Sequence, residues 1–159
     1  MRTIIIDPTA QTVTERETIV DCDLASLIDC DYIERVSLGK SDRVDIGMYV
    51  NEEGLLHIEP STNFFVLKTP QGKAANLTAG KAVIVATDRN GETVDLPPGV
   101  TVNSIRAIVG LVPPEKSQEA AGLAEELLDS GGLITSQEEL DEMKRKFENI
   151  HKRALEIAI

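Results

Sequence analysis

The chain contains few of the residues that most often carry catalysis or build metal sites. It has no tryptophan, two cysteines and two histidines among its 159 residues. Cys22 and Cys30, spaced C-x7-C, are too few for a disulfide scaffold, and no histidine or second cysteine pair accompanies them to complete a zinc site. We therefore expect free thiols, no cofactor and no metal.

Catalytic motifs are also missing. No H-E-x-x-H, G-x-S-x-G or G-x-x-x-x-G-K-[ST] pattern occurs. His57 falls in a predicted strand and His151 in a predicted helix, where a lone histidine is usually a surface or structural residue. Aspartates cluster between residues 21 and 31, but they lack the glycine-centred register of a calcium loop. The sequence predicts a protein that is not an enzyme.

Basic residues, aromatic residues and long apolar runs are sparse as well. The chain has 27 acidic against 16 basic residues, a formal net charge of −11, and only two tyrosines and three phenylalanines. Direct nucleic-acid binding is disfavoured, because it needs clustered Lys and Arg, with exposed aromatics for single strands. No apolar run approaches the ~18 residues of a membrane span. We expect a cytoplasmic protein that binds neither nucleic acid nor membrane.

Up to residue 112 the chain consists of short β-branched runs separated by turn residues, which predicts a small mixed or antiparallel β-sheet body. The segment 23–28 predicts one short helix capped by Asp21 or Asp23. Two segments each have two interpretations: 63–67 as a buried strand or a helical turn, and 102–112 as a strand or a short helix. The remaining expected strands are 3–6, 12–15, 31–38, 44–50, 55–58, 82–86 and 92–96.

Pro113-Pro114 separates this body from a helical segment, residues 113–159, so the predicted fold class is α+β with a two-helix appendage. The periodicity predicts helices over 117–129 and from Ser136 onward, where Ser136 and Glu139 match a capping box. Charge is segregated here: residues 115–142 carry nine acids and one base, and residues 143–159 carry five bases and two acids.

The last helix carries a coiled-coil-type seam of apolar residues at alternating three- and four-residue spacing. Three interpretations remain open: packing onto the preceding helix, pairing with a second subunit, or binding a partner protein. A helical hairpin and an oligomerisation tail are thus both predicted for 113–159. The seam residues are Leu140, Met143, Phe147, Ile150, Ala154 and Ile157.

Parts of the β body resemble a small uncharacterised domain family of phages, plasmids and phage-derived bacterial islands. The matching pieces are Tyr32-Ile33-Glu34-x-Val36, the Asn51-Glu52-Glu53-Gly54 hairpin and Ala79-Gly80-Lys81 with the following strand. The resemblance covers about residues 3–97. The chain departs from it after Asn63, where the family usually has Arg then Ala. The resemblance implies a mobile-element context and no particular reaction.

The leading hypothesis is a non-enzymatic phage or mobile-element protein that binds a host protein, with a possible role against host defence or restriction. Its partners would be a second copy or a host protein, engaged through the C-terminal helix. An alternative is a protein that sequesters a small molecule or nucleotide, and a metal-dependent hydrolase is a third. The candidate ligand-binding residues are Tyr32, Asn51, Asn63 and Lys81.

Overall fold

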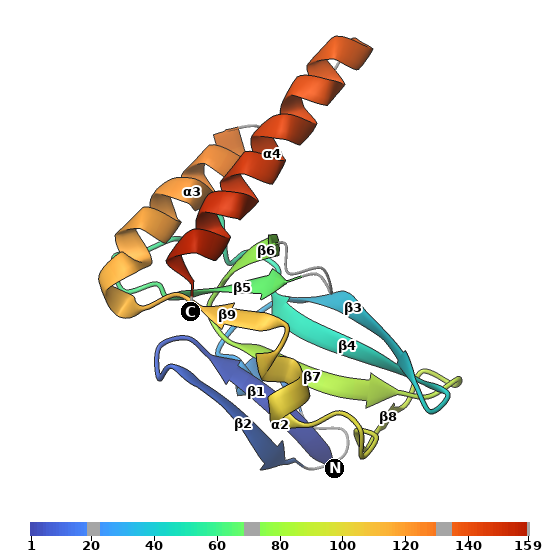
Figure 1. Ribbon diagram of the computed structural model, residues 1–159. Helices are drawn as coiled ribbons and strands as arrows, with labels where there is room; N and C mark the ends of the chain where they lie inside the picture. Colours follow the sequence, from blue (N-terminus) through green and yellow to red (C-terminus); the bar gives the residue numbers. More distant parts are fainter. Residues whose placement is uncertain (19–22, 69–73, 130–134, 159) are drawn as a thin grey trace. The chain divides into compact units, whose positions relative to one another are not determined.

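A computed structural model describes residues 1–18, 23–68, 74–129 and 135–158, and shows the predicted α+β fold (Figure 1). The elements in chain order are β1 (Arg2–Asp7), β2 (Thr12–Glu17), α1 (Leu24–Leu27), β3 (Ile33–Ser41), β4 (Val44–Asn51), β5 (Phe64–Lys68), β6 (Ala74–Ala79), β7 (Ala82–Thr87), β8 (Thr93–Val94), α2 (Val102–Arg106), β9 (Val109–Leu111), the 3-10 turn η1 (Pro114–Lys116), α3 (Ser117–Asp129) and α4 (Gln137–Ile157).

The chain forms two compact units that are interleaved along the sequence. The first unit comprises residues 1–54 and 80–107, and the second comprises 55–79 and 108–159. Each unit therefore joins segments that are distant in the chain. The sequence predicted a division of the chain into two consecutive segments, a body over 1–112 and a tail over 113–159. That division stays a prediction.

The first unit is built on a six-stranded antiparallel sheet with strand order β2-β1-β7-β4-β3, and β8 pairs with β7. β7 lies at the centre of this path, and its residues 82–86 are all buried, as their apolar character on both faces predicts. The strands expected over 3–6, 12–15, 31–38 and 44–50 are confirmed. The strand expected over 92–96 shortens to the two residues of β8.

The register of this sheet brings several strand ends together. Ala82 pairs with both Ile6 and Val50, and Asn51 pairs with Ile33. Lys81, which precedes Ala82, therefore lies at the same end of the sheet as Asn51. The helix expected over 23–28 forms as α1 with Asp23 as its N-cap, and Ile28 packs in a buried cluster with Ile5, Val83 and Val85. Asp21, the other proposed cap, and Cys22 lie outside the described residues.

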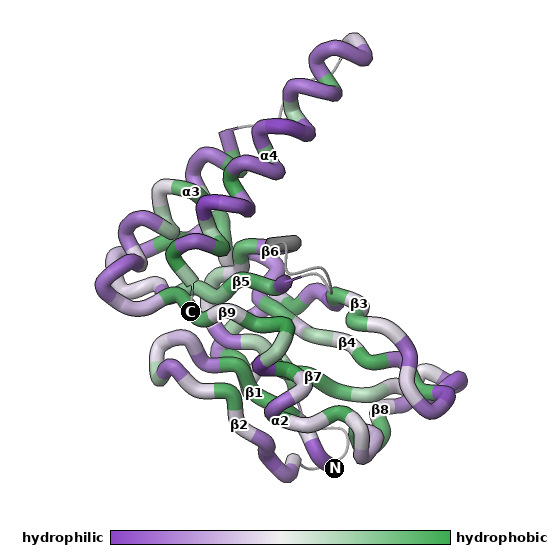
Figure 2. Tube along the Cα trace, viewed as in Figure 1, coloured by the Kyte–Doolittle hydropathy of each residue, from purple (hydrophilic) through white to green (hydrophobic). Residues whose placement is uncertain are grey.

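The second unit combines a three-stranded antiparallel sheet, β6-β5-β9, with α3 and α4. In the hydropathy view β5 and the inner sides of both helices are hydrophobic (Figure 2). Phe64 and Val66 of β5 are fully buried in one cluster with Ala120 and Ala124 of α3 and with the C-terminal half of α4. Of the two interpretations of 63–67, the strand is right.

Three local predictions differ from the structure. The segment 102–112 contains both expected alternatives in succession, α2 and then β9. Strand β6 was not predicted. The return strand over 55–58 is wrong: these residues are turn or irregular, and His57 is exposed in that stretch. The physical reason is that β3 and β7 already occupy both edges of β4, so a chain leaving β4 finds no free edge to pair with.

Candidate functional site

Helix α3 packs on the second unit's sheet by a narrow apolar stripe. Ala120, Leu123 and Ala124, at helical spacing, are buried in the cluster that contains β5. At the start of the helix, Ser117 Oγ donates a hydrogen bond to Asn63 Oδ1 at 3.1 Å, which joins α3 to the residue before β5. The other face of α3 is acidic and exposed.

Helix α4 begins at a side-chain cap, as predicted. Ser136 Oγ accepts a hydrogen bond from Glu139 N at 3.2 Å. In a capping box the Glu139 side chain would accept a hydrogen bond from the backbone N–H of Ser136. Here Glu139 Oε2 instead accepts hydrogen bonds from the preceding residue, from Thr135 N at 2.9 Å and from Thr135 Oγ1 at 3.0 Å. These hydrogen bonds, the backbone one first, lower the pKa of Glu139 below its ordinary value.

The apolar seam of α4 divides into two halves with different environments. Ile150 and Ala154 are 1% and 0% exposed in the core of the second unit, and Ile157 packs against the same cluster. Full burial of an isoleucine side chain such as that of Ile150 contributes roughly 1.5–3 kcal/mol. The preceding seam residues are only half-buried and lie outside that cluster: Leu140, Met143 and Phe147.

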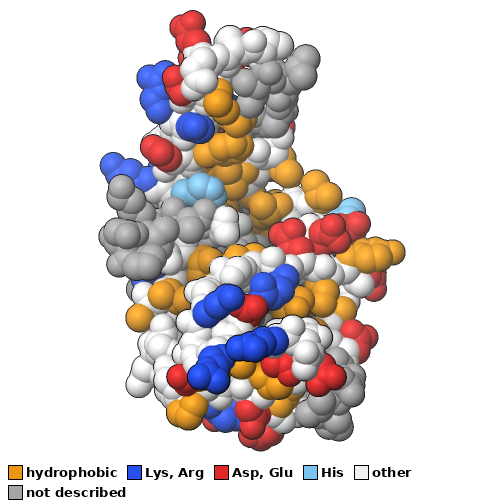
Figure 3. All heavy atoms as spheres, turned by 90° about the vertical axis from the view of Figure 1, so that its right-hand side faces the viewer, with side chains coloured by type: hydrophobic (Ala, Val, Ile, Leu, Met, Phe, Trp, Pro, Cys, Tyr) orange, Lys and Arg blue, Asp and Glu red, His pale blue; other side chains and the backbone are white. Residues whose placement is uncertain are grey.

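The N-terminal half of α4 runs beyond the end of α3 (Figure 1). In the space-filling view, hydrophobic side chains form a strip along this helical part, bordered on one side by acidic and basic side chains (Figure 3). A depression of about 470 Å³ lies beside Met143, and the residues that line it are Asp129, Glu139, Glu142, Met143 and Lys146. The apolar strip is thus bordered by charges of both signs.

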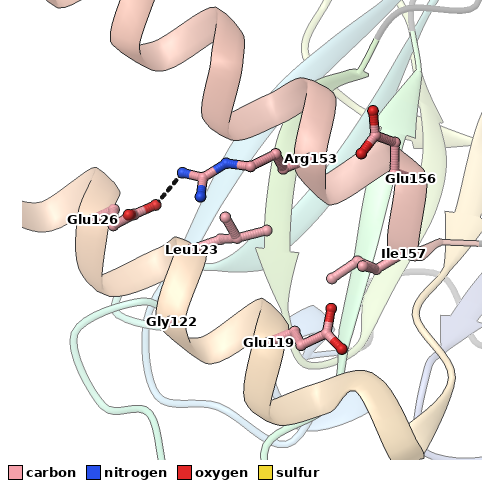
Figure 4. Close-up of a pocket in the computed structure, with 7 residues that line it drawn as sticks. All are labelled: Glu119, Gly122, Leu123, Glu126, Arg153, Glu156 and Ile157. Atoms are coloured by element: carbon pink, nitrogen blue, oxygen red, sulfur yellow. Dashed lines mark hydrogen bonds and ion pairs between the residues drawn. The ribbon is translucent and has the colours of Figure 1, made fainter.

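A second hollow, of about 420 Å³, lies between α3 and the C-terminal half of α4. Leu123 and Ile157 face one another across it, and Glu126 of α3 forms an ion pair with Arg153 of α4 at one side (Figure 4). Glu119 of α3 and Glu156 of α4 also line the hollow (Figure 4).

Two side-chain nitrogen atoms of α4 lack hydrogen-bond partners within the described part of the chain. They are His151 Nδ1 and Arg153 Nε, both shielded from solvent. Burial lowers the pKa of His151 below its ordinary value of 6.5, because the charged imidazolium loses hydration there. His151 therefore favours its neutral form in the folded protein.

Three of the four predicted ligand residues lie at one end of the first unit's sheet. Tyr32 O accepts a hydrogen bond from Glu52 N at 3.0 Å, and Asn51 Oδ1 accepts one from Glu53 N at 3.0 Å. The Tyr32 side chain is 62% exposed. Lys81 lies at the same end by register. The Asn-Glu-Glu-Gly segment is therefore a turn stabilised by its own asparagine, and it does not lead into a second strand.

Lys81 is held by carboxylates of its own unit. Its Nζ lies 2.7 Å from Asp29 Oδ2 and 4.0 Å from Asp7 Oδ2. The hydrogen bond to Asp29 raises the pKa of Lys81 above its ordinary value. Nearby, burial first and then Asp31, Asp23 and Asp29 raise the pKa of the Cys30 thiol, which disfavours a reactive thiolate.

The fourth predicted ligand residue, Asn63, belongs to the second unit and is engaged structurally. Its Nδ2 donates to Ser61 O at 3.1 Å, and its Oδ1 accepts from Ser117. It thereby joins the loop before β5 to the start of α3.

A comparison with protein-family models matches residues 1–108 to a domain of unknown function, DUF3846. The chain belongs to the DUF3846 family. This confirms the sequence resemblance at the level of an uncharacterised domain family. No curated protein and no solved structure gave a significant match.

The DUF3846 match contains the whole first unit together with β5 and β6 of the second, and ends just before β9. Tyr32, Asn51, Asn63 and Lys81 all lie inside the matched region. The α3–α4 hairpin lies beyond it, so the seam and both hollows are features of this chain outside the family region.

Sequence reasoning missed a residue that organises the DUF3846 region. Arg2 donates to Glu15 Oε1 at 2.6 and 2.9 Å and to the carbonyl oxygens of Leu96 and Val100 at 2.9 and 3.0 Å. An arginine second in the chain gives no local signal of such a role. Among the described residues no group of three or more His, Cys, Asp and Glu is placed to hold a metal ion, and no helix is long and apolar enough to cross a membrane.

Proposed function

We propose that this chain is a non-enzymatic protein-binding module that pairs with a second copy of itself through the N-terminal half of α4. The observation that carries the proposal is the divided seam. Leu140, Met143 and Phe147 continue the apolar stripe of Ile150 and Ala154, yet they lie outside the core that buries those two residues. A second helix packed along this half would remove the remaining apolar surface from water.

The order of charges on α4 supports pairing between two antiparallel copies. Acidic residues occupy its first turns and Lys144, Arg145 and Lys146 follow. Glu139 and Lys146 are seven residues apart and therefore flank the seam on the same side. In an antiparallel pair, Glu139 of each copy faces Lys146 of the other, which gives the reciprocal contacts of a twofold interface.

The length of α4 that lies outside the core of the second unit limits the size of the proposed interface. The seam residues Ile150, Ala154 and Ile157 are already packed in the core of their own unit, so the proposed pairing uses about residues 137–148, a length of ~18 Å. So short an interface lies below the standard size of stable complexes, and we expect concentration-dependent association with a Kd on the order of micromolar.

We propose in addition that the functional target is a host protein and that the chain derives from a phage or other mobile element. The support for this context is the resemblance of the Tyr32–Val36 and Asn51–Gly54 segments to a family from such elements. Self-pairing would present two copies of the target-binding surface, which raises avidity for a target with two sites.

Light scattering with mass determination, across a concentration series of the full chain, tests the self-pairing. The expected mass rises from one chain toward two. Met143→Glu should hold the protein at the mass of one chain, whereas Asn149→Glu, which adds the same charge on an exposed position of α4, should leave the association unchanged. The mass of one chain at every concentration would contradict the proposal. Equal effects of the two variants on the measured mass would contradict it as well.

A small-molecule or nucleotide site at the strand ends of the DUF3846 region is the second candidate. It is favoured by the register that gathers Asn51, Lys81 and the exposed Tyr32 at one end of the sheet. A ligand at 100 times its Kd would stabilise the protein by ~2.7 kcal/mol. A thermal-shift panel of nucleotides tests this: a shift abolished by Lys81→Met supports the site, and no shift with any nucleotide rejects it.

A further inference from the structure

The hollow between α3 and α4 has an apolar floor and an acidic rim. Leu123 and Ile157 form its centre, and three acidic side chains and one basic side chain, Arg153, stand around them (Figure 4). Its volume of about 420 Å³ falls in the range of ordinary binding pockets. The hollow lies wholly within the second unit, at the base of the helical hairpin and away from the half of the seam proposed to self-pair.

Gly122 of α3 lines this hollow. It lies in the interior of α3, where glycine costs roughly 0.5–1 kcal/mol relative to alanine. A Cβ built at Gly122 meets nothing within 4 Å, so no contact inside this chain requires glycine there. The glycine gives the helix a bare backbone facing the hollow, which suits close approach by another molecule.

The charges around the hollow are only partly compensated. Glu126 is paired with Arg153 across the two helices. Glu119 and Glu156 form no ion pair with any residue in the described ranges, and both are exposed. Residues 115–129, which include α3, carry five acids and one base, so this helix adds to the negative potential beside the hollow.

We propose that this hollow, a groove between α3 and α4, binds a lysine- or arginine-bearing segment of another protein. The aliphatic part of such a side chain lies along Leu123 and Ile157, its cationic end lies between Glu119 and Glu156, and the segment's backbone passes over Gly122. The inference rests on the proposed protein-binding function and names the chemistry of the target.

A protein segment fits better than a free polyamine. Glu119 and Glu126 are seven residues apart on α3, about 10.5 Å along the helix, so the groove offers contact over two helical turns. A groove of this kind between two helices accepts a helical or extended segment whose apolar residues cover its floor. A polyamine would leave most of that floor exposed.

Fluorescence anisotropy on the full chain tests the inference. The probe is a labelled amphipathic peptide of leucine and lysine, and the matched peptide has glutamate in place of lysine. The leucine–lysine peptide should bind and the glutamate peptide should not. Glu119→Gln with Glu156→Gln should weaken binding at least tenfold, and Gly122→Leu, which fills the groove, should do the same. Glu115→Gln with Glu148→Gln changes the net charge equally away from the groove and should leave affinity within twofold.

Other results would overturn the inference. Equal weakening by the groove pair and the control pair would show general attraction to an acidic surface. Full competition by spermidine at similar affinity would assign the groove to free polyamines. Loss of self-association in Gly122→Leu would make a second copy the occupant. Met143→Glu separates the two proposals: unchanged peptide binding by a monomeric variant supports the groove independently of pairing, and peptide binding lost in this variant contradicts it.

Discussion

Arg2 and Glu15 are joined across β1 and β2 by two charge-assisted hydrogen bonds, from Nε and a terminal nitrogen of the guanidinium to Glu15 Oε1. The same guanidinium reaches the carbonyl oxygens of Leu96 and Val100, some 94 and 98 residues later in the chain. One side chain thus ties the first hairpin to the segment that precedes α2. The fixed fork of an arginine allows this, and a lysine cannot reproduce it.

Arg2→Lys should therefore lower the free energy of unfolding by about 1–3 kcal/mol, because partly buried carbonyl oxygens lose their donors. Urea denaturation followed by circular dichroism measures the change. Arg16→Lys, on the exposed face of β2, is the control and should stay within about 0.5 kcal/mol of the wild type. Equal effects of the two variants would contradict the role assigned to Arg2.

Ser136→Ala should destabilise α4 by about 1 kcal/mol, because Glu139 N loses the acceptor that caps the helix. The effect should appear as a lower Tm and less helical signal. Asn149→Ala, at an exposed interior position of the same helix, should raise helicity slightly. A Tm for Ser136→Ala at or above that of Asn149→Ala would show that the cap does not stabilise the helix.

Protonation of His151 should destabilise the fold in mildly acidic solution. Burial lowers its pKa in the folded state, so below pH 6.5 the unfolded chain binds a proton that the folded chain resists. Stability is therefore full above that pH and falls as the pH drops toward the lowered folded-state value. His151→Gln should flatten this part of the stability curve, while His57→Gln, at an exposed position, should retain it. The same slope in both variants would reject His151 as the cause.

Sequence patterns predicted the elements whose signals are local. The run 82–86, which is apolar on both faces, identified the central strand, and Ser136 identified the start of α4. Both signals depend only on residues that are neighbours in the sequence. The return strand after Gly54 failed for the opposite reason. Whether a segment forms a strand depends on which strand edges are already paired with segments distant in the sequence. The edge of β4 that the segment after Gly54 would need is paired with β7.

The candidate sites show the same limit. That Asn51 and Lys81 lie at one end of the same sheet depends on the register between β4 and β7, and the assignment of Asn63 to the other unit follows from the interleaving of the two units along the chain. The division of the seam between Phe147 and Ile150 depends on where the core of the second unit ends. Periodicity alone defines a stripe on α4 and does not show which of its residues belong to that core.

Amide hydrogen exchange at several protein concentrations tests the central claim most directly, because it locates the self-pairing surface on the helix. The proposal predicts that protection of residues 137–148 increases with concentration, while residues 150–157, already packed in their own core, keep the same protection throughout. Protection of residues 137–148 that is independent of concentration in a range where the mass doubles would contradict it, because the interface would then lie elsewhere.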